Sequence, residues 1–444
     1  MTVPVMLEPL YTAQEMRGAE EGHDVGELMA RAGRAVAEEA LRRYPDAQSF
    51  SAVCGQGANG GDARIALDVL RSVGRKADEG LAGDVIIDGL FGTGFRGEPR
   101  PEAAAQIEEM NGRGAPIVAV DLPSGVNADT GEVEGVAVRA ELTVAMHGRK
   151  VGNVVAPGRF HCGEVVVADI GLDPGETEHR LVTREILSLI PPKRVEDNKY
   201  TAGHVLVVGG APGMSGAASL TANAALRADC GYVTICAPAP SLPVLETLVV
   251  EAVKRPLEGA FDAAARASAL ALGPGLGRTP DRRELVRRLL AETELPAVVD
   301  ADALHELEPV ERRASTVLTP HAGELGRLLD EDSDWVSAHR LEAVRRGSER
   351  FGCVCLLKGA DTLVAAPGRG VVVAAHGPPS LAAAGTGDVL TGVTAAFLAK
   401  GIEAPLAAAA AATACGLAAW LRPARGLIAG DVIGALPEVL DAEI

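Results

Sequence analysis

The chain has 444 residues, of which 47% are hydrophobic, 3% are aromatic and 23% are charged, and its formal net charge is −18. This length predicts two or three domains, with cores built from aliphatic side chains. The acidic balance excludes nucleic acid and anionic membranes as main partners, because phosphate groups are bound by basic patches. It does not exclude a nucleotide, since backbone N–H groups at the start of a helix also bind phosphate.

Cysteine usage and the chain's apolar segments indicate a cytoplasmic protein. The seven cysteines contain no CxxC pair, and Cys353 and Cys355 alternate as in a buried strand, which is typical of a reducing compartment. Residues 1–16 lack the pattern of a signal peptide. The alanine-rich segment 404–421 includes Pro405 and predicts a buried core helix rather than a membrane span.

In chain order, the first half alternates between helical and strand patterns. Helices are expected over residues 19–44, 62–74 and 101–114, and strands over 49–55, 84–92, 115–125, 140–148 and 163–172. Alternation of this kind predicts a parallel sheet with helices on both faces.

A linker with Pro191 and Pro192 follows, and the domain boundary is expected near residues 186–195. We therefore divide the chain into residues 1–188 and 189–444. The second part restarts the α/β pattern, with a helix over 215–230 and strands within 204–213, 231–238, 267–277, 295–304, 315–321, 353–367 and 370–377.

Glycine-rich or polar loops follow the strands of the second part. Parallel sheets bind ligands beyond the carboxyl ends of their strands, so these loops are expected to share one edge. They are GGAPGMSGA (209–217), LGPGLG (272–277), DADAL (300–304), TPHAGEL (319–325), KGADT (358–362) and GTGD (385–388).

The GTGD loop predicts a phosphate site at the start of a helix, because its backbone N–H groups lie close together. Asp388 would then accept a proton from a substrate hydroxyl as its oxygen attacks phosphorus. Its alternative is a helix cap or an early-turn acid that complements the helix dipole. Because the other glycine-rich or polar loops are expected at the same edge of the sheet, we favour the catalytic interpretation.

The neighbouring polar residues leave alternatives open. Lys358 and Thr362 either hold phosphate or ribose oxygens or lie solvated in a hairpin. His321 contacts a substrate or satisfies a loop carbonyl. Asp300 and Asp302 orient a metal ion or water, although Asp302 equally suits a helix cap.

In the first part, a strand, a glycine loop and a helix over residues 53–67 are able to cradle a pyrophosphate, although neither a GxGxxG nor a Walker A pattern is present. Asn59, Asp88 and Ser124 follow three strands and offer oxygen ligands for a monovalent cation. Asp121 is then free for acid–base chemistry. The alternative is ordinary turn chemistry by these residue types.

Taken together, the motifs resemble the bifunctional NAD(P)H-hydrate repair family over about residues 8–180 and 195–440. The family joins an NAD(P)HX epimerase domain to an ADP- or ATP-dependent (S)-NAD(P)H-hydrate dehydratase domain. The resemblance implies an α/β fold, with a shortened Rossmann-like three-layer domain followed by a ribokinase-like domain. It rests on ANGGD, DGLFGTGFRGE, VDLPSGVNADTG and PGRFHCGEVVVADIGL in the first part, and on all six loops of the second.

The resemblance also implies residue roles. Asp388 activates the C6 hydroxyl of the hydrated cofactor, whose phosphorylation turns a poor leaving group into a good one, and Asp121 is the acid–base residue of the epimerase. The remaining roles are hydrate binding in the epimerase by Ala58, Asn59, Gly60, Gly61, Asp62, Gly92, Thr93, Gly94, Phe95, Arg96, Gly97, Glu98 and Asp121; hydrate binding in the dehydratase by Ala217, Gly275, Gly277, His321 and Asp388; nucleotide binding by Lys358, Gly359, Ala360, Asp361, Thr362, Gly385, Thr386 and Gly387; and potassium binding by Asn59, Asp88 and Ser124.

The implied cofactors and partners are K⁺ in the epimerase domain, Mg²⁺ in the dehydratase domain, ADP or ATP as phosphoryl donor, and NAD(P)HX as substrate. We expect a homo-oligomer, with no nucleic-acid or membrane partner.

Two departures from the family pattern concern the first domain. Ala58 and Ala63 replace an asparagine and a glycine of the family motif. Only ten residues, 74–83, separate the helix from the strand beginning at Asp84, where the family places another strand and helix. Ten residues do not supply both, so we expect one β–α unit to be missing and epimerase activity to be reduced or absent.

Two other functions fit parts of the pattern. The second domain resembles the wider ribokinase-like group, which predicts a small-molecule kinase that releases a stable phosphorylated product. The first domain alternatively serves as a non-catalytic ligand-binding module.

Overall fold

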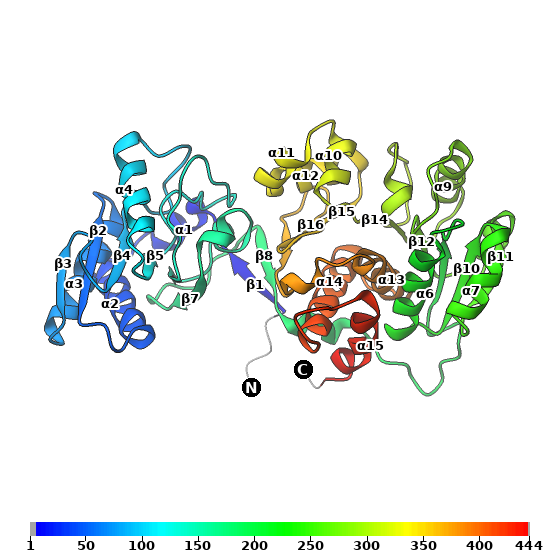
Figure 1. Cartoon of the computed structure of the whole chain (residues 1–444), viewed down its shortest axis with the longest axis horizontal. Coiled ribbons are helices and arrows are strands. Elements are labelled where there is room, and N and C mark those ends of the chain that lie inside the picture. The colour runs from blue at the N-terminus through cyan, green and yellow to red at the C-terminus, as the bar shows by residue number, and fades with distance from the viewer. Residues whose placement is uncertain (1–5, 443–444) are drawn as a thin grey trace. The chain divides into compact units, whose positions relative to one another are not determined.

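The computed structural model describes residues 6–442. Their contacts divide the chain into two compact units (Figure 1). The amino-terminal unit comprises residues 9–180 and 337–341, and the carboxy-terminal unit comprises residues 181–336 and 342–442 with residues 6–8. The boundary expected at residue 188 stays a prediction.

The amino-terminal unit is built on a six-stranded sheet in which every neighbouring pair is parallel. In spatial order its strands are β3 (Lys76–Glu79), β2 (Ser49–Cys54), β4 (Val85–Gly89), β5 (Ile117–Val120), β6 (Leu142–Met146) and β7 (Glu164–Ala168). The five strands predicted from the sequence are confirmed. The order reverses between β2 and β4, and in such sheets the loops beyond the carboxyl ends diverge there to form a crevice.

Helices cover both faces of this sheet, which confirms the three-layer prediction. They are α1 (Ala13–Glu20), α2 (Val25–Arg43), α3 (Ala58–Ser72), α4 (Pro101–Gly112) and α5 (Val151–Val154). Successive strand residues point to opposite faces, so Ile87 packs in the core beneath α2 and α3 with Leu67. Its neighbour Ile86 packs with Ile107 and Met110 of α4 on the other face.

The glycine motif after β2 is helical, which corrects the loop expected there. Helix α3 begins at Ala58, so Ala58–Asp62 form its first turns and only residues 55–57 form the connection. A Cβ on Gly60 would lie 2.0 Å from the carbonyl oxygen of Gly55. The motif's glycine therefore permits a tight strand-to-helix turn, whose pattern is hard to tell from a loop.

The structure corrects the expected loss of a whole β–α unit, because the strand of that unit is present. Residues Lys76–Glu79 form strand β3, which pairs in parallel with β2 at the edge of the sheet (Figure 1). The helix alone is absent, because residues 80–84 lead directly from β3 to β4. A Cβ on Gly83 would lie 2.4 Å from the backbone nitrogen of Ser51, so this connection crosses close to β2. The strand was not predicted because its sequence, KADE, is polar. Charged side chains of this kind are common in edge strands.

The carboxy-terminal unit contains most of an eleven-stranded sheet, in the order β1-β8-β17-β16-β15-β14-β13-β12-β9-β10-β11. Its strands are β1 (Leu7–Leu10), β8 (His179–Val182), β9 (His204–Val208), β10 (Tyr232–Ala237), β11 (Val253–Pro256), β12 (Ala269–Leu272), β13 (Ala297–Val299), β14 (Thr316–Leu318), β15 (Val354–Leu357), β16 (Thr362–Ala365) and β17 (Val372–Ala374). The run from β11 to β15 is parallel, and β15, β16 and β17 are antiparallel. Strands β1, β8 and β11 were not expected from the sequence.

The helices of this part of the chain are α6 (Ser215–Arg227), α7 (Leu242–Leu248), α8 (Ala260–Ala264), α9 (Pro280–Glu292), α10 (Ala322–Leu329), α11 (Ser333–Ala338), α12 (Arg340–Phe351), α13 (Thr386–Ala399), α14 (Ala404–Trp420) and α15 (Ala429–Leu440). Short 3₁₀ helices span Gly158–His161, Arg184–Leu189, Ala239–Ser241, Leu257–Gly259, Ala301–Leu304 and Pro379–Leu381. The alanine-rich α14 lies in the core, as predicted. Among residues 6–442, no helix has the length and apolar character needed to cross a membrane.

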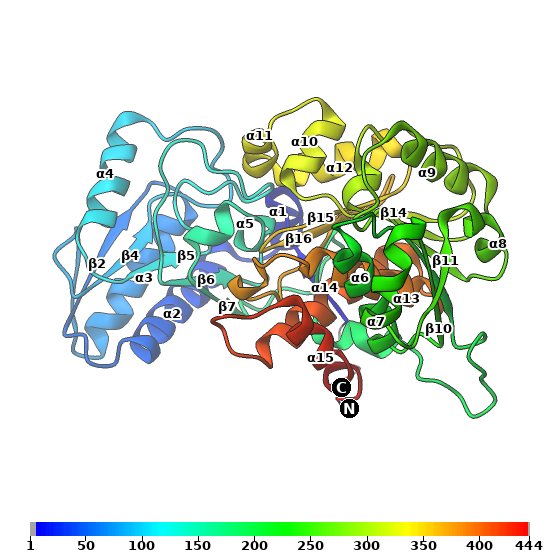
Figure 2. The same cartoon turned by 45° about the vertical axis from the view of Figure 1, so that its right-hand side comes forward.

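Helices α6 and α13 lie side by side against one face of the sheet (Figure 2). Gly392 of α13 makes their close approach possible, because a Cβ there would lie 2.2 Å from the carbonyl oxygen of Thr221 in α6. Thr221 Oγ1 donates a hydrogen bond of 3.1 Å to the carbonyl oxygen of Asp388. The helix pair thereby fixes the start of α13, where the GTGD motif lies.

Replacing Gly392 with alanine is expected to push α13 away from α6 and to lower the free energy of unfolding by about 1–3 kcal/mol. Gly216→Ala in α6 is the matched control, because a Cβ at Gly216 meets nothing within 4 Å. Urea unfolding of both variants measures the difference. Equal free energies of unfolding would contradict this account of the helix contact.

Candidate functional site

The carboxyl edge of the larger sheet brings two of the predicted glycine loops together. Its strand order reverses between β9 and β12, and the loops that follow them are joined by Gly210 N to Pro274 O (2.9 Å) and Ala211 N to Gly275 O (2.6 Å). Gly275 has a φ of +59°, and a Cβ on it would lie 3.2 Å from that of Ala217. Two residues expected to contact the hydrate are therefore neighbours.

A buried ion pair lies at the centre of this edge. Asp300 follows β13 and is 2% exposed, and its Oδ1 accepts a 2.8 Å hydrogen bond from Lys358 Nζ, which follows β15. Its Oδ2 accepts a 2.8 Å hydrogen bond from Thr391 Oγ1 in α13. Asp300 thus links two strands to the helix that carries the GTGD motif. From the sequence, Asp300 was expected to orient a metal ion or water, and nothing in the sequence indicated Thr391.

Lys358 keeps its charge in this setting. Burial disfavours the charged amine, but Asp300, Glu324 and Asp388 outweigh that effect and raise the pKa of Lys358. A Cβ on Gly387 would lie 3.4 Å from Lys358 Nζ, so the ammonium group lies beside the glycine turn at the start of α13. A fixed cation next to free backbone N–H groups is suited to bind phosphate.

Asp388 lies in the first turn of α13, beside this cation. Gly385, with a φ of +89°, caps the helix, so the interpretation of Asp388 as the helix cap is wrong. The other part of that alternative, an acid in the first turn of the helix, agrees with the position of Asp388. Among residues 6–442, no hydrogen bond holds the Asp388 carboxylate. Burial and the neighbouring Asp300 raise the pKa of Asp388 to about 6, against the opposing effect of Lys358. An acid that only complemented a helix dipole would not require a raised pKa.

His321 caps helix α10 instead of contacting a loop carbonyl. Its Nδ1 accepts hydrogen bonds from Gly323 N (3.0 Å) and Glu324 N (3.2 Å), and Glu324 Oε2 accepts one from the His321 backbone (2.9 Å). Because Nδ1 is an acceptor, the hydrogen of the neutral ring lies on Nε2. The exposed Nε2 therefore carries a hydrogen, and it lies 3.5 Å from Glu324 Oε2.

Asp302 supports the LGPGLG loop rather than a helix start. Its carboxylate accepts hydrogen bonds from Gly277 N (2.9 Å) and Arg278 Nε (2.7 Å). A cavity of about 230 Å³ adjoins these residues and is lined by Gly277, Asp302 and His305, among others. In the hairpin after β15, Thr362 Oγ1 donates to Gly359 O (3.1 Å), so these predicted nucleotide-binding residues form an ordered turn.

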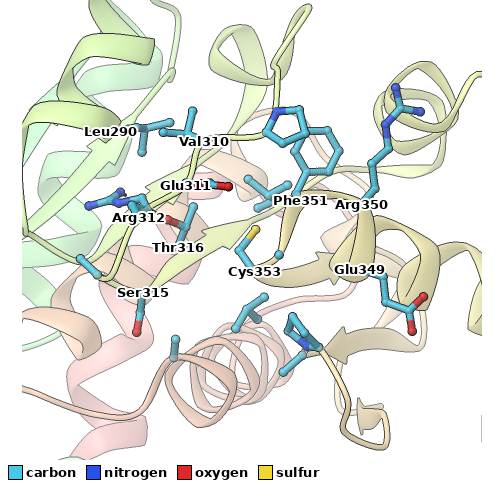
Figure 3. A pocket seen from close by; sticks show the side chains of 18 of the residues that line it. Leu290, Val310, Glu311, Arg312, Ser315, Thr316, Glu349, Arg350, Phe351 and Cys353 are labelled. Atoms are coloured by element: carbon cyan, nitrogen blue, oxygen red, sulfur yellow. Dashed lines mark hydrogen bonds between the residues drawn. The ribbon is translucent and has the colours of Figure 1, made fainter.

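A larger cavity, of about 700 Å³, lies at the opposite edge of the sheet (Figure 3). Its walls include Arg312, Thr316 and Cys353, which precede or begin β14 and β15. Arg312 Nη2 donates hydrogen bonds to the carbonyl oxygens of Thr293 (3.2 Å) and Leu295 (2.5 Å). Ligand sites of parallel sheets lie at the carboxyl ends of the strands, so we assign the chemistry to the smaller cavity's edge.

In the amino-terminal unit, the three predicted potassium ligands lie in the first turn of α3 (Asn59), in β4 (Asp88) and in the loop after β5 (Ser124). Fully buried Asp88 accepts hydrogen bonds from Ser124 Oγ (2.6 Å), Ser124 N (2.7 Å) and Leu90 N (3.2 Å). Asn59 Nδ2 donates to Val120 O (2.6 Å), which directs Oδ1 toward the loop after β4, where a Cβ on Gly92 would lie 2.3 Å away.

The loop from Gly92 to Glu98 is ordered by contacts within the same unit. Phe95 stacks on Phe91 with ring centroids 4.6 Å apart, and Arg96 forms an ion pair with Asp129. A Cβ on Gly135 would lie 3.0 Å from Cγ of Glu98. The predicted hydrate-binding residues of this loop therefore lie beside the segment that follows β5.

Asp121 has a partner that the sequence did not reveal. Its carboxylate forms an ion pair with Lys150 and accepts a 2.9 Å hydrogen bond from Met146 N. Lys150 is fully buried and also donates to the carbonyl oxygens of Met146 (2.7 Å) and Gly148 (3.1 Å). The available signal was a lysine within the small and apolar run GRKVGNVV, directly after a predicted strand.

Comparison with known proteins identifies the chain. Residues 205–433 match the NAD(P)H-hydrate dehydratase family model, and residues 25–79 and 74–152 match the model of the YjeF-related protein N-terminus. The bifunctional NAD(P)H-hydrate repair enzyme Nnr of Pyrobaculum aerophilum is 37% identical over 93% of this chain and 93% of its own length. The enzyme of that name from Escherichia coli is 32% identical over 98% and 94%.

The chain belongs to the bifunctional NAD(P)H-hydrate repair family.

Solved structures match the carboxy-terminal part of this family member. The ADP/ATP-dependent NAD(P)H-hydrate dehydratase from Bacillus subtilis, co-crystallised with ATP and Mg²⁺, is 29% identical, with a TM-score of 0.54 over 58% of this chain and 96% of that one. A ribokinase-like superfamily protein from Enterococcus faecalis, 21% identical with a TM-score of 0.53 over 60% of this chain and 97% of that one, shows the fold alone. The ribokinase-like prediction is confirmed.

Lys150→Met leaves the Asp121 carboxylate buried without its cation. We expect the free energy of unfolding of the amino-terminal unit to fall by about 3–5 kcal/mol, the usual loss when one partner of a buried ion pair is removed. Calorimetric unfolding measures the change. The double variant Asp121→Asn with Lys150→Met is the control and is expected to recover part of the loss. A single variant as stable as wild type would contradict this account.

Proposed function

We propose that this chain repairs hydrated NAD(P)H. Its carboxy-terminal unit would dehydrate the S epimer of NAD(P)HX at the expense of ADP or ATP, and its amino-terminal unit would interconvert the R and S epimers. The observation that carries the first activity is the Asp388 carboxylate. It is half-buried, free of hydrogen bonds within the described chain, and lies beside Lys358 at the start of α13.

The dehydratase chemistry follows from these groups. Asp388 takes the proton of the C6 hydroxyl as its oxygen attacks the terminal phosphorus of the nucleotide. The backbone N–H groups at the start of α13 and the Lys358 ammonium group stabilise the charge on the transferred phosphoryl oxygens. Phosphate then leaves C6 with its bonding electrons while C5 loses a proton, which restores the C5=C6 double bond.

The residues expected at the two sites keep their proposed roles. In the carboxy-terminal unit, residues 358–362 and 385–387 bind the nucleotide, and Ala217, Gly275, Gly277 and His321 contact the hydrate. His321 would donate the Nε2 hydrogen to the hydrate in place of its 3.5 Å contact with Glu324 Oε2.

Mg²⁺ would be bound mainly through the nucleotide, because its preferred ligands in such sites are phosphate oxygens and water. No group of three or more acidic, histidine or cysteine side chains suited to a metal ion occurs in the part of the chain that the structure describes. When bound, the ion neutralises the phosphates during transfer.

For the amino-terminal unit, we propose that residues 58–62 and 92–98 and Asp121 bind the hydrate, with Asp121 as an acid–base residue. Asn59, Asp88 and Ser124 would hold K⁺. The fit rests on Asp88: burial raises the pKa of this carboxyl, and no ion pair involves it within residues 6–442. A cation bound there would supply the charge that its hydrogen-bond donors only partly replace.

The absent helix between β3 and β4 bears on the rate of epimer exchange. Strands β2, β4 and β5, which precede or contain Asn59, Asp88 and Asp121, are intact and paired with one another, whereas the crossover beside β2 is shortened. We propose that exchange persists but is slower than in relatives with the complete crossover. A measured exchange rate equal to theirs would refute the reduced rate.

The division at residue 188 into an epimerase and a dehydratase domain, a homo-oligomeric state and a cytoplasmic location complete the proposal. The location is supported by the seven cysteines, all of which are free thiols.

Asp388→Asn is the test of the dehydratase. With mixed epimers of hydrated NADH and ADP or ATP, we expect wild type to restore the absorbance of reduced nicotinamide, and the variant to be slower by about 10²–10⁴-fold, the usual contribution of a general base. Asp262→Asn, on the exposed side of α8, is the matched control and should behave as wild type. No nucleotide-dependent recovery by wild type would favour the small-molecule kinase.

The dehydration rate is also expected to depend on pH. Asp388 acts in its deprotonated form and its pKa is about 6, so the rate should fall as pH decreases through about 6 and level off above it. Steady-state rates with saturating nucleotide and S epimer measure this profile. A rate that stays constant through this region would contradict Asp388 as the base.

A further inference from the structure

Asp62 is a buried carboxyl group that the described chain leaves without a partner. It lies in α3 and is 6% exposed, and its Oδ1 has no hydrogen-bond partner within residues 6–442. By contrast, Asp88 in the same unit receives three donors. A buried polar group without a partner costs about 1–3 kcal/mol, so Asp62 calls for a functional explanation.

The helix dipole does not explain Asp62. The favourable field at the amino end of a helix falls off within the first turn, and Asp62 lies beyond the first turn of α3, which begins at Ala58. Its charged neighbours are also unfavourable, because they are the carboxylates of Asp121 and Glu20. The buried cation of this cluster, Lys150, is bonded to Asp121. Lys150 thus neutralises Asp121, whereas Asp62 has only negatively charged neighbours.

Epimerisation at C6 requires the acid that this arrangement provides. C6 of the hydrate carries a hydroxyl group and is bonded to the ring nitrogen N1, so it is a hemiaminal carbon. Inversion by ring opening needs a base that takes the hydroxyl proton and an acid that protonates N1. Two titratable groups whose environments differ strongly are the usual form of such an acid–base pair.

On the basis of the proposed epimerase function, we propose that Asp62 is the general acid of epimer exchange and the partner of Asp121. The Asp121 carboxylate takes the C6 hydroxyl proton, and the C6–O bond becomes a carbonyl. The N1–C6 bond breaks, its electron pair moves to N1, and Asp62 donates its proton there. After rotation of the aldehyde, N1 attacks the other face of C6 and both protons return, so that no further reactant is consumed.

The electrostatics of Asp62 agree with this role. Burial, Asp121 and Glu20 all raise the pKa of Asp62, to about 7. A substantial fraction of the group therefore carries a proton at neutral pH, as an acid requires, and releases it readily.

The experiment measures exchange between the R and S epimers by chromatography, on the full chain without nucleotide so that dehydration does not occur. After subtraction of the spontaneous rate, Asp62→Asn is expected to lower exchange by about 100-fold or more while binding of the R epimer is retained. Asp68→Asn, on the exposed side of the same helix, is the matched control and should exchange at a near wild-type rate. Nucleotide-dependent dehydration of the S epimer should be unchanged in both variants.

The wild-type pH profile is a second test that does not depend on the variant's folding. The charged groups that face Asp62 are Asp121 and Glu20. Because Asp62 must be protonated, the enzymatic exchange rate should fall as pH rises through about 7.

Exchange by Asp62→Asn at the wild-type rate, or a wild-type rate that does not fall through this region, would overturn the role of Asp62 and leave the epimerase proposal standing. Absence of exchange in wild type would overturn both.

Discussion

The ion pair between Asp300 and Lys358 is the interaction on which the carboxy-terminal site depends. It joins the ends of β13 and β15, and through Thr391 it also fixes α13. The pair therefore fixes the position of α13 relative to these two strands. Its charges also determine the chemistry, since Asp300 raises and Lys358 lowers the pKa of Asp388.

Both units use the same electrostatic arrangement at the carboxyl edge of a parallel sheet. In each, one carboxylate directly after a strand is neutralised by a lysine: Asp300 by Lys358, and Asp121 by Lys150. In each, a second carboxyl group on a helix near that edge has no ion pair of its own among residues 6–442, and its pKa is raised: Asp388 to about 6 and Asp62 to about 7. The neutralised member stabilises the site, and the other is suited to exchange a proton near neutral pH.

The sequence predicted those features that depend on local pattern. Buried runs such as DVIIDG and HVLVV predicted the strands, and the glycine loops predicted which edge carries the site, because neighbouring parallel strands end together. The features it did not predict depend on tertiary packing. A polar strand such as KADE has no apolar face to reveal it. The partners Lys150 and Thr391 lie far in sequence from Asp121 and Asp300, and no local pattern joins them.

Family membership and site geometry together favour dehydration over simple phosphorylation, but only the products distinguish the two. The most direct measurement is the ratio of inorganic phosphate released to reduced nicotinamide recovered, with ADP or ATP as donor and the S epimer as substrate. Repair by phosphorylation and elimination predicts equal amounts of both. Consumption of nucleotide with a stable phosphorylated product, and no matching release of phosphate, would contradict the account.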